Sequence, residues 1–202
     1  MARQLDFYFD CSSPWTYLAF HAVRPLAAES AAAIVWKPIL VGGVFNTVNP
    51  SVYDNRAKPN PLKQRYMLKD LADWARFEGL RIVFPPTVFP VNSVKCMRGA
   101  CHALDEDKLV PYATAAFEAY WGDDRDISSE EVLADIAVRA GLDRQRFFAA
   151  IETAACKQRL RTNTDELIAR GGFGSPTMFV GDAMFFGNDR LPLVKAALEA
   201  TS

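Results

Sequence analysis

The chain opens with a dense apolar run that ends at a cluster of small polar residues. Leu5–Asp10 carries aromatic or apolar side chains at most positions, which predicts a buried strand. The run stops at Cys11-Ser12-Ser13-Pro14, residue types that start helices, and apolar residues then continue as far as Val23. A second strand is expected at Ala33–Leu40. This order predicts a βαβ unit with two parallel strands.

The middle of the chain has a different pattern. The segment Asn46–Pro61 is rich in proline and asparagine and is predicted to be a loop. Helical spacing of apolar residues follows. The expected helices are Leu62–Glu78, Val91–Leu104, Val110–Trp121, Ser129–Ala140 and Arg144–Glu152. So long a helical stretch between strands indicates a helical lid or subdomain.

The C-terminal part returns to a mixed pattern. Asn163–Arg170 ends a helix, and the expected strands Pro176–Val180 and Ala183–Phe186 are joined by a turn at Gly181-Asp182. A last helix is expected at Leu191–Ala200. Together the elements predict an α/β, thioredoxin-like fold with an all-helical insertion domain. The predicted boundaries are residues 1–60 and 163–202 for the split thioredoxin-like domain, and 61–162 for the insertion.

Composition narrows the possible functions. Lys and Arg total 23 against 24 Asp and Glu, so a net charge of −1 offers no field for nucleic acid and no polybasic membrane patch. The four cysteines form no C-x-x-C pair, and with two histidines they show no metal-ligand spacing. The first ten residues lack the apolar run of a signal peptide. We therefore expect a cytoplasmic protein without a metal.

The turn at Ser13 is the first candidate site. A helix N-terminus after a buried strand presents free N–H groups and a positive dipole end, which suit a thiolate or another anion. A serine hydroxyl there would help to keep the thiolate ionised. Simple helix capping by Ser12 or Ser13 explains the pattern equally well. Cys11 is a possible nucleophile, although a cysteine that ends an apolar strand is more often buried and inert.

The second candidate is Gly174-Ser175-Pro176-Thr177, directly ahead of a strand. A cis bond before Pro176 would turn the backbone of Ser175 outward and offer its N–H and C=O to an extended peptide ligand. An ordinary trans proline is the alternative that base rates favour.

These residues belong to a set that resembles the 2-hydroxychromene-2-carboxylate isomerases, which are similar to kappa-class glutathione transferases and have a DsbA-like thioredoxin fold. The resemblance runs over nearly the whole chain. It rests on Phe7-Tyr8-Phe9-Asp10, Ser13-Pro14, Tyr17-Leu18-Ala19, Lys37-Pro38, Gly42-Gly43-Val44-Phe45, Arg65-Tyr66-Met67, Asp70-Leu71, Trp74-Ala75, Gly174-Ser175-Pro176-Thr177 and Gly187-Asn188-Asp189-Arg190.

The resemblance implies glutathione as the cofactor and Ser13 as the residue whose hydroxyl stabilises its thiolate. Ser175, before Pro176, would pair its backbone with the cysteinyl part of glutathione. The polar pair after the last strand would hold the γ-glutamyl end; this pair is Asn188 and Asp189. A loop asparagine also contacts the ligand in relatives, and Asn49 is preferred here over Asn55.

Three further residues are candidates for substrate binding. They are Trp15, Lys37 and Trp121. Lys37 could attract a carboxylate, or it could be an edge residue that keeps its ammonium in water. Trp121 could form an aromatic wall beside the substrate, although a helix-ending loop with solvated charges is the simpler interpretation.

The preferred hypothesis is a glutathione-dependent isomerase that interconverts 2-hydroxychromene-2-carboxylate and trans-o-hydroxybenzylidenepyruvate, or acts on a related aromatic-degradation intermediate. Reversible addition of the thiolate would make a double bond rotatable. The alternatives are a kappa-like glutathione transferase or glutathione-linked oxidoreductase, which Cys11 favours, and a thiol-binding module without turnover. The resemblance also implies a homodimer and a small aromatic substrate.

Overall fold

The computed structural model describes residues 3–200, and a four-stranded sheet lies at its centre. The strands are β1 (Arg3–Phe9), β2 (Ala32–Pro38), β3 (Thr177–Val180) and β4 (Ala183–Phe186), in the order β2-β1-β3-β4. β2 runs parallel to β1, whereas β3 is antiparallel to both β1 and β4. The predicted βαβ unit and C-terminal hairpin are therefore confirmed.

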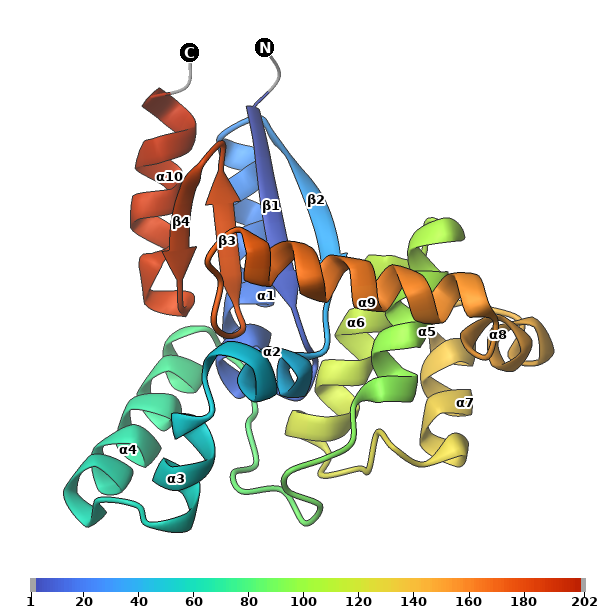
Figure 1. Cartoon of the computed structure of the whole chain (residues 1–202), viewed down its shortest axis with the longest axis horizontal. Helices are drawn as coiled ribbons and strands as arrows, with labels where there is room; N and C mark the ends of the chain where they lie inside the picture. Colours follow the sequence, from blue (N-terminus) through green and yellow to red (C-terminus); the bar gives the residue numbers. More distant parts are fainter. Residues whose placement is uncertain (1–2, 201–202) are drawn as a thin grey trace.

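Helices cover both faces of the sheet because the apolar residues of β1 point both ways. Phe7 and Phe9 pack toward α1 (Pro14–Glu29) and α10 (Leu191–Ala200), and Tyr8 packs on the opposite side. That opposite side is covered by α2 (Val41–Val48) and α9 (Ala154–Ala169). Figure 1 shows α9 crossing in front of the sheet, with α1 behind it.

A layer of helices extends the larger core beyond the edge of β2 (Figure 1). Its elements are α5 (Val94–Asp105), α6 (Leu109–Phe117), a π-helical turn (Glu118–Gly122), α7 (Glu130–Arg139) and α8 (Arg144–Ile151). The Tyr17 ring of α1 stacks on Phe117 of α6, with centroids 5.2 Å apart and planes tilted by 7°. Aromatic packing of this kind joins the layer to the first helix of the thioredoxin-like part.

The prediction of a loop at Asn46–Pro61 is wrong, because this segment is largely helical. It contains the end of α2, then α3 (Ser51–Ala57), and it leads into α4 (Pro61–Phe77). Pro50 and Pro61 lie at helix starts, where a missing N–H costs little. Asn60 caps α4 by accepting hydrogen bonds from the N–H groups of Leu62 and Lys63. Proline and asparagine here mark the boundaries between helices.

Helix α9 crosses the predicted domain boundary at residues 162 and 163. Within it, the Asn163 side chain donates to the carbonyl of Pro38 at 3.0 Å, and Thr164 accepts from the N–H of Leu40 at 3.0 Å. The same helix begins against α5 and α8 in the helical layer and ends over the sheet. The division of the chain into the two predicted domains stays a prediction.

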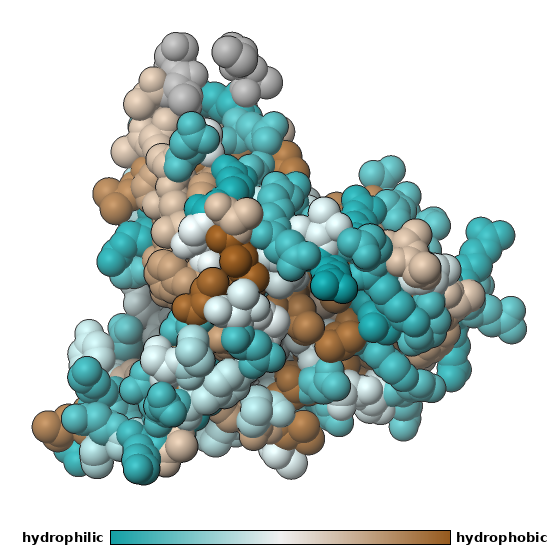
Figure 2. All heavy atoms as spheres, viewed as in Figure 1, coloured by the Kyte–Doolittle hydropathy of each residue, from teal (hydrophilic) through white to brown (hydrophobic). Residues whose placement is uncertain are grey.

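Helix α4 exposes several large apolar side chains. Leu62, Tyr66 and Phe77 are 73%, 66% and 79% exposed. Figure 2 shows hydrophobic atoms standing out at the α4 end of the molecule among hydrophilic neighbours. Within residues 3–200 no helix is both long and apolar enough to cross a membrane.

Candidate active site

Ser13 is the N-cap of α1 and also faces the loop that precedes β3. Its hydroxyl oxygen accepts from the Thr16 N–H at 3.3 Å and donates to the carbonyl oxygen of Ser175 at 3.2 Å. Pro14 follows at the first helical position, where its fixed φ suits the helix. The cap is thus Ser13 rather than Ser12, and one residue fulfils both the capping and the proposed site geometry.

The peptide bond between Ser175 and Pro176 is cis. The Ser175 hydroxyl accepts from the Asp10 N–H at 3.0 Å and shares a hydrogen bond of 2.8 Å with the hydroxyl of Thr16. These bonds tie the loop before β3 to the turn between β1 and α1. The two motifs that the sequence placed far apart are therefore brought together, with the Ser175 carbonyl directed at Ser13.

Asp10 is a fully buried carboxylate beneath this turn, and sequence reasoning did not single it out. It accepts hydrogen bonds from the Ser12 N–H (2.9 Å), the Val41 N–H (2.8 Å) and the Ser93 hydroxyl (3.0 Å). Burial raises the pKa of Asp10, and the hydrogen bonds oppose that rise. The available signal was an acidic residue directly after the aromatic run that ends the strand.

Cys11 is fully buried, and burial raises the pKa of its thiol well above the ordinary value, with the neighbouring Cys96 acting in the same direction. Its N–H points to the Met97 sulfur at 3.3 Å. Such a thiol stays protonated and out of reach of a substrate. The structure therefore does not support Cys11 as an attacking nucleophile.

Trp121 supports the serine turn from within the core. The π-helical turn that contains it directs the indole N–H to the carbonyl of Cys11 at 2.9 Å. The side chain is 0% exposed, so it offers no surface to a ligand in this structure. The proposed contact between Trp121 and substrate is therefore corrected to a contact with the backbone that leads into Ser13.

Asn49 lies next to the loop that carries the cis proline. Its side-chain amide donates to the carbonyl of Phe173 at 3.2 Å, and the Ser51 hydroxyl donates to its oxygen at 3.0 Å. Asn55, in α3, is exposed. Of the two candidate asparagines, Asn49 is the one with a contact to this loop.

A short 3-10 turn, η2 (Asn188–Arg190), lies beside the same loop because the Gly187 N–H donates to the Pro176 carbonyl at 3.1 Å. Asn188 is only 7% exposed, and its amide nitrogen is buried without a hydrogen-bond partner among the described residues. An unpaired buried amide is costly and indicates a place for a ligand acceptor. Asp189 is exposed and pairs with Arg190 at 2.6 Å.

The two remaining candidates lie in different surroundings. Trp15 is partly exposed in the first turn of α1, two residues after Ser13. Lys37 lies on the α9 side of the sheet, where its ammonium forms an ion pair with Glu166 at 2.9 Å. Its charge is therefore already engaged by α9, and the structure does not bring Lys37 to the serine turn.

The residues around Ser13 are arranged so that they can bind an anionic, peptide-like ligand. Ser13 and the N-terminus of α1 can stabilise a small anion or thiolate. The backbone at Ser175 can pair with an extended peptide-like ligand, and the amide of Asn188 can bind a carboxylate or carbonyl beyond it. Among the described residues, no group of three His, Cys, Asp or Glu side chains could hold a metal ion.

Comparison with known proteins places the chain in a family. Residues 4–199 match the model of the DSBA-like thioredoxin domain. The chain is 32% identical to a 2-hydroxychromene-2-carboxylate isomerase of Pseudomonas putida, over 96% of this chain and 93% of that protein. It is 29% identical to a kappa 2 glutathione S-transferase of Caenorhabditis elegans, over 95% and 90% of the two chains.

Solved structures agree with this placement. The structure of a 2-hydroxychromene-2-carboxylate isomerase matches with a TM-score of 0.84 and 32% identity, covering 98% of this chain and 95% of that one. The cytosolic disulfide reductase DsbM of Pseudomonas aeruginosa, solved with GSH, shares the fold at a TM-score of 0.65 and 16% identity, over 98% of both chains. The chain therefore belongs to the 2-hydroxychromene-2-carboxylate isomerase family of enzymes, which have the DSBA-like thioredoxin fold.

Proposed function

We propose that this enzyme is a glutathione-dependent isomerase that interconverts 2-hydroxychromene-2-carboxylate and trans-o-hydroxybenzylidenepyruvate, or isomerises a closely related aromatic-degradation intermediate. The observation that carries the proposal is the contact between the Ser13 hydroxyl and the Ser175 carbonyl, 3.2 Å apart, at the N-terminus of a long helix. Relatives named for this isomerisation align over nearly the whole chain.

The residues around Ser13 suit glutathione. A tripeptide thiol needs a donor for its sulfur, a backbone edge for its cysteinyl unit, and donors for its terminal carboxylates. Ser13, the backbone of Ser175 and the unpaired amide of Asn188 supply these groups from neighbouring loops. Asn49, beside the loop that carries the cis proline, and Asp189, next to Asn188, are further proposed contacts.

Each residue has a distinct task in the proposed reaction. When bound, glutathione supplies a thiolate that adds reversibly to a conjugated carbon and makes a double bond of the substrate rotatable. The Ser13 hydroxyl turns from the Ser175 carbonyl and donates a hydrogen bond to the sulfur, while the N–H groups of the first turn of α1 supply positive potential. Both effects favour the ionised thiol at neutral pH.

The proposed substrate is a small aromatic carboxylate. The partly exposed indole of Trp15, in the same helical turn as Ser13, is the proposed aromatic contact. Lys37 is not proposed as its carboxylate partner, because Glu166 already engages its ammonium.

The test follows isomerisation by ultraviolet absorbance with and without glutathione. We expect activity only with glutathione, and we expect Ser13→Ala to lower kcat/KM by about 100-fold. Ser129→Ala is the matched control, because Ser129 begins a different helix and forms no side-chain cap bond. Full activity of Ser13→Ala, or activity in the absence of glutathione, would contradict the proposal.

A kappa-like transferase is the second candidate, and the relatives of that class favour it. Conjugation of glutathione to a generic aryl halide, at a rate above that of isomerisation, would support this alternative. A binding module without turnover would bind glutathione but leave the pKa of the bound thiol unchanged. The oxidoreductase alternative loses the support of Cys11, which is buried and protonated.

The assembly and the compartment stay predictions. We propose a homodimer, which sedimentation of the purified protein would test. We also propose the cytoplasm as its compartment, because the cysteines of the described residues are all free and the cofactor must stay reduced. Fractionation of the source cells would test that location.

A further inference from the structure

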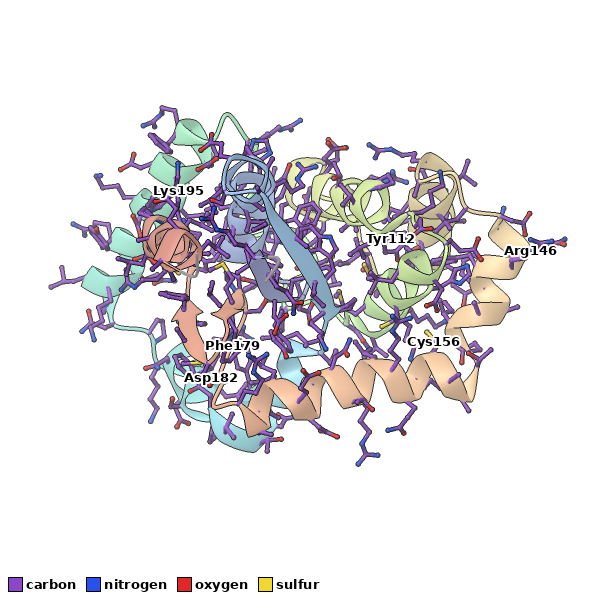
Figure 3. The ribbon with its side chains drawn as sticks, turned by 90° about the horizontal axis from the view of Figure 1, so that it is seen from above. Tyr112, Arg146, Cys156, Phe179, Asp182 and Lys195 are labelled. Atoms are coloured by element: carbon purple, nitrogen blue, oxygen red, sulfur yellow. The ribbon has the colours of Figure 1, made fainter. Side chains whose placement is uncertain are left out.

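Two cysteines outside the proposed active site meet where α9 passes α5. Cys101, in α5, is 1% exposed, whereas Cys156, in the first turn of α9, is half-buried. The Cys156 thiol donates to the carbonyl of Arg98 in α5 at 3.2 Å, one helical turn before Cys101, and the two thiols influence each other's pKa. Figure 3 shows Cys156 near the N-terminal end of α9, on the side of that helix that faces the helical layer. Cys156 is therefore partly accessible to solvent, whereas Cys101 is enclosed.

Several neighbours of Cys156 favour its thiolate, although the hydrogen bond to the Arg98 carbonyl requires the protonated thiol. The Cys156 N–H donates to the N-cap hydroxyl of Thr153 at 3.2 Å, which places the thiol at the positive end of the α9 dipole. The neighbouring Cys101 thiol lowers the pKa of Cys156, and the charges of Arg98 and Arg159 act in the same direction, whereas burial and Asp105 oppose them. A thiolate is the nucleophilic form of cysteine.

The chain contains a second thiol pair that serves as an internal comparison. Cys11 and Cys96 also interact, but both are 0% exposed. Burial raises the pKa of Cys11, so this pair offers neither an ionised sulfur nor access to a reagent. The two pairs therefore differ in accessibility and charge, although both consist of neighbouring thiols.

We propose that Cys101 and Cys156 form a reversible dithiol–disulfide site that reacts with low-molecular-weight disulfides such as oxidised glutathione. The Cys156 thiolate attacks one sulfur of the reagent, forming a mixed disulfide and releasing one reduced thiol. Cys101 then loses its proton and attacks the Cys156 sulfur, which releases the second reduced thiol. Two protein thiols are oxidised to one disulfide, and the reagent takes up both electrons and both protons.

The new bond would join α5 to α9 covalently. These helices already share an ion pair between Asp105 and Arg159 next to the thiols. A cross-link there restricts the unfolded chain, and so it should raise resistance to denaturation. The proposed chemistry does not depend on Ser13, and it can hold even if the isomerase proposal fails.

The experiment treats the fully reduced, full-length protein with oxidised glutathione at neutral pH and measures its intact mass. We expect the loss of two hydrogen atoms. Trypsin should then release residues 99–108 linked to residues 147–157, since cleavage after Arg98 and Arg146 isolates one cysteine in each peptide. The peptides that contain Cys11 and Cys96 should stay reduced.

Two variants separate the steps. Cys101→Ser should stop at a single glutathionyl group on Cys156, whereas Cys156→Ser should leave Cys101 unmodified. Cys96→Ser is the matched control and should still form the bond. The oxidised wild type should show a higher urea midpoint than the reduced protein, and a thiol reductant should reverse the change.

Three results would overturn the proposal. The first is a wild-type protein that keeps a glutathionyl group without losing two hydrogens. The second is a linked peptide that contains Cys11 or Cys96. The third is a folded protein that does not react under conditions in which the urea-unfolded chain does. Peptide mapping of the wild type decides the matter even if a variant fails to fold.

Discussion

The hydroxyl oxygens of Thr16 and Ser175 lie 2.8 Å apart, and both side chains are buried. This hydrogen bond joins the first turn of α1 to the residue before the cis proline. The Ser13 hydroxyl forms a second hydrogen bond between the same two segments, to the Ser175 carbonyl at 3.2 Å. The bond therefore helps to set the spacing of the two groups on which the proposed thiolate site depends.

Replacing Thr16 by valine keeps the shape of the side chain and removes its hydroxyl. We expect the free energy of unfolding to fall by about 1–2 kcal/mol, because Ser175 loses one buried hydrogen-bond partner. Urea denaturation of Thr16→Val, Ser175→Ala and the double variant gives the coupling between them. Strictly additive losses would show that the bond does not contribute.

Replacing Ser13 by aspartate separates helix capping from thiolate binding. Aspartate caps helices about as well as serine but cannot donate to the Ser175 carbonyl, so we expect the helix to stay capped and the free energy of unfolding to fall by about 1–3 kcal/mol. Its negative charge should repel the glutathione thiolate, raise the pKa of the bound thiol and abolish isomerisation. Absorbance of the thiolate against pH measures that pKa, and an unchanged value would contradict the proposed role of Ser13.

Replacing Asn188 by alanine tests the buried amide without a partner. Since its nitrogen forms no hydrogen bond in the described structure, we expect almost no loss of stability but a KM for glutathione raised by about 10-fold. Asn163→Ala is the contrasting variant, because the amide of Asn163 is bonded to Pro38 and its loss should lower stability. An unchanged KM in Asn188→Ala would remove this residue from the site.

Asp10→Asn tests the effect of the buried carboxylate on pH dependence. Burial raises the pKa of Asp10 in the folded state above its ordinary value of 3.8. The folded protein therefore loses stability as pH rises from 3.8 through the folded-state pKa, because the buried carboxyl must ionise. Asparagine does not titrate, although its NH₂ group meets a backbone donor and should cost about 1–3 kcal/mol at every pH. The difference in unfolding free energy, variant minus wild type, should therefore increase with pH across this window.

Asp73→Asn is the control for that series. Asp73 is a surface residue whose pKa is lowered mainly by the hydrogen bond from Lys69, so it stabilises the fold above its ordinary pKa and this contribution is lost as pH falls. For Asp73→Asn, the unfolding free energy of the variant minus that of the wild type should therefore decrease as pH rises. Urea titrations from acid to neutral pH measure both series, and parallel curves would contradict the assignment for Asp10.

The local sequence pattern was sufficient to predict an element where the residues of that segment favour one structure only. The apolar run of β1, the serine turn and the C-terminal hairpin were all predicted, because dense apolar runs, helix-start residues and turn residues are local signals. The segment Asn46–Pro61 was predicted wrongly because proline and asparagine also begin helices, as Asn60 and Pro61 do for α4. Composition alone does not distinguish these two uses.

Most of the candidate site depended on resemblance or on tertiary contacts. No local signal tells that Glu166, far along the chain, engages Lys37, or that Trp121 turns its indole toward the backbone of Cys11. The unpaired amide of Asn188 is likewise visible only once the surrounding loops are placed. Such features arise from long-range packing, which neither periodicity nor motif spacing encodes.

Helix α9 connects the helical layer to the sheet. It is anchored to β2 and the start of α2 through Asn163 and Thr164, and it contacts α5 and α8 at its other end. The helical layer therefore cannot rotate away from the sheet unless α9 bends or the hydrogen bonds of Asn163 and Thr164 break. A movement that admits a ligand to Ser13 would therefore involve other elements, foremost the helices α3 and α4.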